Sequence, residues 1–200
     1  MRKLEPDEAA FFRAICDHPD EDTPRLVYAD WLDERAAELP GYLQLRRSMI
    51  ARAEFIRIQI AEAAKSLTNQ YHRPLTERDR ELLAKWNTPD WWQKDIPELT
   101  AVEVWRHEFV RGFPYRMSTG SVRSFLKAAP DLLTRAPVPH IPFKTITPRT
   151  AGELARSPFL ARVRHLDQFN GITDGCLVAL AGSLHLCNLA KVVFGPGQVT

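Results

Sequence analysis

Two stretches in the last third of the chain follow one pattern: SPFLARVRHL at Ser157–Leu166 and SLHLCNLAKV at Ser183–Val192. In each stretch a serine is followed by apolar residues three, six and nine positions later, and the shift between them is 26 residues. The dipeptide Leu-Ala precedes both stretches at the same spacing, and a fainter copy of the pattern begins near Val138. This agreement at many positions indicates that the region is built from true internal repeats.

A period of about 20–29 residues with apolar residues at every third position is typical of leucine-rich repeats. Each unit of such a repeat is a short strand followed by a helix, and neighbouring units stack into a curved α/β solenoid. The pattern predicts clear units near 154–179 and 180–200 and a fainter one near 136–150, within a region that spans 101–200.

Strand geometry predicts which residues of the repeats face outward. Successive side chains of a strand point to opposite faces, so His165 and Asp167 are expected to face away from the core, as are Lys191 and Val193 one repeat later. We take these four as candidate interaction residues, although a register shift of one residue would exchange the faces. The last repeat shows no C-terminal cap, which predicts that a partner chain or a self-associating edge covers residues 183–194.

The first half of the chain, residues 1–100, is predicted to be helical. Apolar residues at helical spacing predict helices over 7–17, 23–37, 42–67 and 76–85. Thr23 is the expected N-cap of the second helix, because Pro24 suits the first helical position. An irregular aromatic segment follows, in which Trp91 and Trp92 either plug the helical core or form an exposed anchor for a partner. Beyond it, an extended segment is expected over 108–115 and a helix over 121–135.

Three segments of this half resemble the bacterial repeat-companion domain: FFRAI at 11–15, DHPDEDTPRLVYADWLDER at 17–35 and RAEFIRIQ at 52–59. The resemblance implies a short helical domain that precedes leucine-rich repeats, and it brings no catalytic residues with it. The residue pair Trp105-Arg106 and the triplet Arg111-Gly112-Phe113 also resemble the segment that joins this domain to the repeats. Residues 36–51 form a longer Leu- and Arg-rich insertion that departs from the family pattern.

These observations together predict the fold class and the domain organisation. The fold class is α+β, with an N-terminal helical repeat-companion domain over 1–100. This domain is expected to cap a short C-terminal leucine-rich repeat region over 101–200, because an open solenoid end exposes apolar surface and unpaired strand groups.

The composition is that of a globular protein, with 44% hydrophobic and 26% charged residues. It excludes a disordered chain, a collagen-like repeat and a membrane bundle, so no membrane partner is expected. The start, MRKLEPDE, lacks the apolar segment of a secretory signal. Three widely spaced cysteines, Cys16, Cys176 and Cys187, form no disulfide framework and favour the reducing cytoplasm.

Charge is distributed unevenly between the two halves. The net charge of +2 consists of −4 in residues 1–100 and +6 in residues 101–200. The basic residues of segment 106–135 are candidate nucleic-acid contacts: Arg106, Arg111, Arg116, Arg123, Lys127 and Arg135. They are spread singly, so nucleic acid is the alternative partner rather than the first one.

No catalytic, cofactor or metal constellation is found in the sequence. The stretch from Asp20 has neither the glycine nor the glutamate of a calcium-binding loop, His107-Glu108 lacks the second histidine of a zinc protease, and no glycine-rich phosphate loop occurs. Cys176 and Cys187 are expected to pack in or beside the core. The charged residues Arg25, Asp30, Asp33, Glu34 and Arg35 are expected to form a structural network that Glu54 and Arg57 join, or alternatively a recognition surface.

The function expected from the sequence is therefore a non-enzymatic protein–protein interaction or scaffold module that uses a leucine-rich repeat face. The alternative is an accessory subunit of a nucleoprotein complex that binds nucleic acid through residues 106–135.

Overall fold

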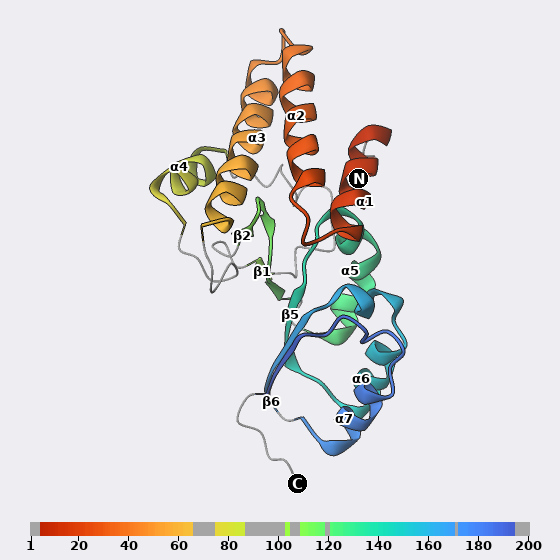
Figure 1. Cartoon of the computed structure of the whole chain (residues 1–200). Coiled ribbons are helices and arrows are strands. Elements are labelled where there is room, and N and C mark those ends of the chain that lie inside the picture. Colours follow the sequence, from red (N-terminus) through yellow and green to blue (C-terminus); the bar gives the residue numbers. More distant parts are fainter. Residues whose placement is uncertain are drawn as a thin grey trace. The chain divides into compact units, whose positions relative to one another are not determined.

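The computed structural model describes residues 5–65, 75–86, 103–104, 109–118, 121–170 and 172–194 (Figure 1). The chain is of the mixed α+β class and divides into two compact units. The first unit contains Met1–Asp95 and His107–Pro114, and the second contains Ile96–Arg106 and Tyr115–Thr200. The chain therefore returns to the first unit once, through a short segment that follows residue 106, instead of passing from one unit to the other at residue 100.

The first unit contains four helices, whose bounds are α1 (Pro6–Asp17), α2 (Thr23–Ala37), α3 (Leu43–Ala63) and α4 (Glu77–Trp86). Each lies within a few residues of a helix predicted from apolar spacing. The predicted cap of α2 is wrong by one position, because Asp22 is the N-cap and Thr23 and Pro24 occupy the first two helical positions. Proline is tolerated there because the first N–H groups of a helix have no partner within the helix.

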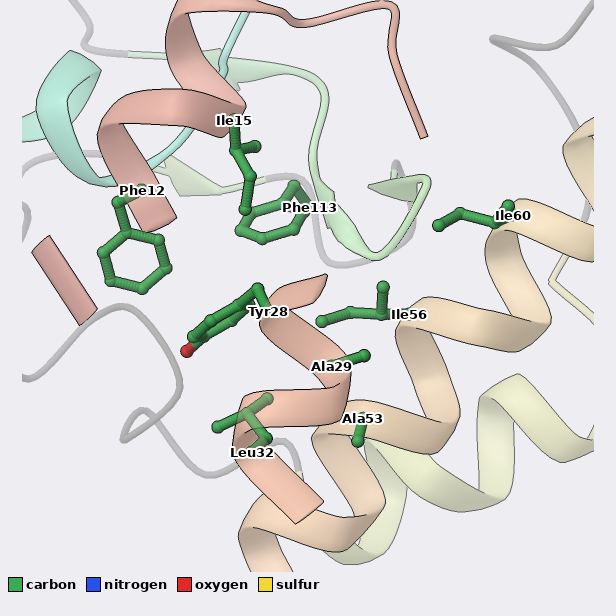
Figure 2. Packing of buried hydrophobic residues seen from close by; sticks show 9 residues of the cluster. All are labelled: Phe12, Ile15, Tyr28, Ala29, Leu32, Ala53, Ile56, Ile60 and Phe113. Carbon is green, nitrogen blue, oxygen red and sulfur yellow. The ribbon is translucent and has the colours of Figure 1, made fainter. Parts of the chain in front are cut away.

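One apolar cluster joins α1, α2 and α3 of this unit (Figure 2). Phe12 from α1 and Tyr28 from α2 have ring centroids 5.1 Å apart, and Ile56 from α3 is fully buried beside them. A second cluster joins α3 to α4, with Phe55 at its centre. Residues of α3 therefore contact two cores, which explains why apolar side chains cover more than half of that helix between residues 51 and 60.

A hairpin completes both clusters of the first unit. It pairs β2 (Phe109–Val110) with β3 (Phe113–Pro114) around a two-residue turn, Arg111-Gly112. Both turn residues have positive φ, 52° and 80°, as the tight turn favoured between twisted strands requires. Phe109 packs in the cluster of Phe55 and Phe113 in that of Phe12. The hairpin therefore links the two clusters.

The second unit combines two sheets with three α-helices. A two-stranded antiparallel sheet pairs β1 (Glu103–Val104) with β4 (Met117–Ser118). A three-stranded parallel sheet has the order β5 (His140–Thr145), β6 (His165–Asn170) and β7 (Lys191–Phe194). The helical segments are α5 (Val122–Arg135), α6 (Pro148–Ala155), the 3-10 helix η3 (Pro158–Arg162) and α7 (Asp174–Ala181).

The register of the parallel sheet follows the spacing of the sequence pattern. Ile141 pairs with Leu166, 25 residues later, and Leu166 pairs with Val192, 26 residues later. The row begins in the core, where Ile141 is 0% and Leu166 1% exposed. Leu154 of α6 and Leu180 of α7, also one period apart, are both buried, whereas Ala181 was expected to face inward and is exposed.

Polar side chains connect successive units of this region through the backbone. The amide of Asn188 donates to the carbonyl of Ala161 at 2.8 Å, and Arg162 donates to the carbonyl of Leu133. Since a buried carbonyl without a partner is costly, these bonds favour stacking of one unit on the next.

Candidate functional site

The four candidate interaction residues of the repeats lie on one face of the parallel sheet. His165 pairs with Lys191, and Asp167 pairs with Val193. Because successive side chains alternate between faces, all four lie opposite the buried Leu166. We call this side of the sheet the outer face. On β5 it carries His140, which pairs with His165, and Pro142, which pairs with Asp167.

A hydrogen-bonded polar cluster occupies the inner part of the outer face. His140 Nε2 lies 2.6 Å from Asp167 Oδ2, and the hydroxyl of Tyr115 lies 2.9 Å from His165 Nδ1. The two imidazole rings have centroids 5.6 Å apart, and each is 5.7 Å from the ring of Tyr115. The contacts hold both histidines in defined positions, because each ring has a hydrogen-bond partner and an edge contact with an aromatic ring.

Arg116 extends this arrangement beyond β5. It pairs with His140 in an isolated parallel bridge, and its guanidinium lies 3.8 Å from Asp167 Oδ2. The register therefore aligns four basic residues across the sheet: Arg116, His140, His165 and Lys191. The side chain of His140 is 7% exposed, those of Asp167 and Arg116 about 15%, whereas Lys191 and Val193 are exposed. The accessible part of the outer face is therefore the part near β7.

Sequence reasoning missed Tyr115 and His140. A signal for His140 was present, because it precedes His165 by 25 residues, the shift of the fainter repeat. Tyr115 gave no such signal, because it stands outside the repeats and reaches His165 across 50 residues of sequence.

The basic residues proposed for nucleic acid do not form one surface. Arg111 lies in the first unit, where its Nε is 2.8 Å from Asp22 Oδ1. Arg116 belongs to the second unit and lies near Asp167, and Arg135 is half-buried. Only Arg123 and Lys127, both exposed on α5, lie on one side of a helix, whereas Arg106 is outside the described residues.

The charged network of the first unit forms in part. Arg57 of α3 binds Asp30 at 2.6 Å and Asp33 at 2.7 Å, which ties α3 to α2 as expected. Glu54 instead pairs with Arg78 of α4 at 2.8 Å.

Arg25, expected in the same network, is buried and donates to backbone carbonyls at the end of α1, among them those of Pro19 and Glu21. Burial lowers the pKa of Arg25 to about 10, and the nearby Arg111 guanidinium lowers it further. Arg25 therefore closes the end of α1 instead of pairing mainly with carboxylates.

The remaining candidates give no chemical site among the described residues. Cys176 is buried as expected, but Cys187 is exposed, because it lies in the loop before β7 and not in the core. No three His, Cys, Asp or Glu side chains within the described ranges gather where they could hold a metal ion. No helix in that part of the chain is long and apolar enough to span a bilayer. Trp91 and Trp92 lie outside the described residues.

Comparisons with protein-family models, with curated proteins and with solved structures found no match to this chain. The resemblance to the repeat-companion domain and the assignment of the repeats as leucine-rich therefore stay predictions.

Proposed function

We propose that this chain is a non-enzymatic protein–protein interaction module that binds a partner protein through the outer face of the β5–β6–β7 sheet. In this proposal β5–α6, β6–α7 and β7 are units of a short leucine-rich repeat, and the helical first unit is a repeat-companion domain that caps it. The parallel strands, paired 25 and 26 residues apart, support the repeat assignment. The three cysteines are free thiols, which fits a reducing cytoplasm.

The observation that carries the proposal is the composition of the outer face at β7. Lys191 and Val193 are exposed there beside the half-buried His165, and the described residues place no further strand next to β7. A cationic and an aliphatic side chain on a flat, strand-built surface offer a protein both charge and apolar contact. Buried bonds hold His140, His165 and Asp167 beneath them, so this surface is formed before binding.

The test is affinity capture from the native lysate with the tagged full chain, at low and at high salt, followed by mass spectrometry. We expect one protein to be recovered at both salt concentrations and to be lost with the double variant Lys191→Glu, Val193→Asp. Val178→Asp is the matched control, because Val178 is 72% exposed on α7 and lies on a helix instead of the sheet.

Two outcomes would overturn the proposal. Equal loss of the captured protein with the control would place the contact away from the outer face. Recovery of nucleic acid alone, at low salt only, would favour the nucleoprotein alternative, because phosphate contacts weaken steeply with salt. Arg123→Glu with Lys127→Glu on α5 would then identify the basic surface.

A further inference from the structure

We propose that the free edge of β7 accepts an acidic strand from another protein. This strand would place an aspartate or glutamate beside Lys191 on the outer face and aliphatic residues beside Val192 on the core face. The inference rests on the proposed function and names the chemistry of the partner. A segment of alternating acidic and aliphatic residues that adds as a fourth strand is the occupant to which it commits.

The apolar row on the core face argues for an added strand. The row runs from Ile141, 0% exposed, through Leu166, 1% exposed, to Val192, which is 37% exposed. Each of the first two residues is covered because a neighbouring strand continues the row. An aliphatic side chain on a fourth strand would cover Val192 in the same way, since residues directly opposite each other in neighbouring strands contact one another.

The backbone of β7 argues in the same direction. Lys191–Phe194 pairs with β6 on one side, and the described residues supply no strand on the other side. An edge strand presents unpaired N–H and C=O groups that another extended segment can use. Main-chain hydrogen bonds to such an edge supply affinity, and alternate side chains supply specificity.

Charge complementarity selects the acidic partner. Lys191 ends the row of four basic residues, is exposed, and forms no ion pair with the residues that the structure describes. Within this face the carboxylate of Asp167 is already bound to His140 at 2.6 Å. Like charges directly opposite each other across strands are destabilising, whereas opposite charges stabilise the pair. A second copy of β7 would bring another lysine to the same face, so an acidic strand fits better.

The experiment uses three synthetic peptides, acetylated and amidated, as strand probes. The first is Ser-Thr-Val-Glu-Val-Thr-Ser, the second replaces the glutamate with lysine, and the third has the composition of the first but the order Ser-Val-Val-Glu-Thr-Thr-Ser, which removes the alternation. Each is titrated into the isotopically labelled full chain at low salt, and the backbone amide signals of residues 191–194 are followed by NMR.

We expect the glutamate peptide to shift these amide signals and to bind about three- to tenfold more tightly than the lysine peptide, as cross-strand charge pairs predict. The variant Lys191→Glu should reverse this preference. Lys144→Glu is the matched control, because Lys144 is exposed on β5, two strands away from the free edge, and changes the net charge equally. This control should keep the preference of the natural chain.

Three results would overturn the inference: no shift of the β7 amide signals at millimolar peptide, equal binding of the alternating and non-alternating peptides, or an unchanged preference in Lys191→Glu. Circular dichroism of this variant must match that of the natural chain, and Lys191→Gln, which should abolish the preference without reversing it, provides a second test. If the outer-face variants still abolish protein capture while the peptides fail, the proposed function stands and strand addition is excluded.

Discussion

At the scale of single residues, the outer face is held by polar groups that are largely removed from water. His140 is 6% exposed and lies 2.6 Å from Asp167, which also neighbours Arg116. Burying a polar group is costly unless it is hydrogen-bonded, so each member of this cluster depends on the others. The cluster therefore both stabilises the second unit and fixes the shape of the surface that the proposed function uses.

We expect Asp167→Ala to lower the free energy of unfolding by about 1–3 kcal/mol, because it removes the acceptor of a nearly buried imidazole. Chemical denaturation followed by circular dichroism measures this change. Glu153→Ala is the control in the same unit, since its contacts with Arg149 and Arg123 lie at 3.3 and 3.7 Å on exposed side chains. Exposed pairs contribute about 0–1 kcal/mol, and equal losses in the two variants would contradict the role of the cluster.

A second prediction concerns Gly112 in the β2–β3 turn. Its φ is +80°, and a Cβ built there would lie 2.6 Å from a side-chain carbon of Ile56. We expect Gly112→Ala to destabilise the chain by about 1–3 kcal/mol through backbone strain and the clash with α3. Gly41→Ala, where a Cβ meets no atom within 4 Å, should stay within about 0.5 kcal/mol of the natural chain. Thermal unfolding compares them, and a harmless Gly112→Ala would show that the hairpin can move away from α3.

At the scale of elements, successive units of the second half begin their helices differently. The N-cap of α6, Thr147, forms a capping box with Thr150, whereas the N-cap of α7, Thr173, makes no side-chain bond to the helix backbone. Both helices have eight residues, so the difference lies in the cap and not in the length. α6 therefore carries a local stabilising device that α7 lacks.

We expect Thr147→Ala to cost about 0.5–2 kcal/mol of stability and Thr173→Ala clearly less, because only the first substitution removes a cap. Urea midpoints of the two variants and the natural chain test this. A larger loss for Thr173→Ala would mean that its contact with Cys176 Sγ at 3.4 Å matters more than capping.

At the scale of the whole molecule, each compact unit has its own buried core. Leu32 is 4% exposed within the helical cluster of the first unit, and Leu166 is 1% exposed in the parallel sheet of the second. Truncating a buried leucine to alanine typically costs about 2–5 kcal/mol. The location of each loss is informative, because local stability differs between parts of a protein.

We expect Leu166→Ala to raise hydrogen exchange in β5, β6 and β7 more than in α2 and α3, and Leu32→Ala to produce the opposite pattern. Hydrogen exchange read by mass spectrometry on the full chain measures both. Equal acceleration throughout the chain in either variant would show that the units unfold as one.

The sequence alone determined the helices and the repeat spacing of this protein. α2 begins and ends where apolar spacing and Pro24 predict, and the strands pair at the 25- and 26-residue shifts read from the pattern. Such features are local or periodic, since a helix face and a repeat unit are set by nearby residues.

Only the tertiary structure decided which distant side chains meet. It brings Tyr115 to His165, gives Arg25 to the carbonyls at the end of α1, and pairs Glu54 with Arg78. These contacts depend on how elements pack, and the pattern of any one segment holds no information about its partner's position. The polar cluster beneath the outer face was found for that reason only once the strands were aligned.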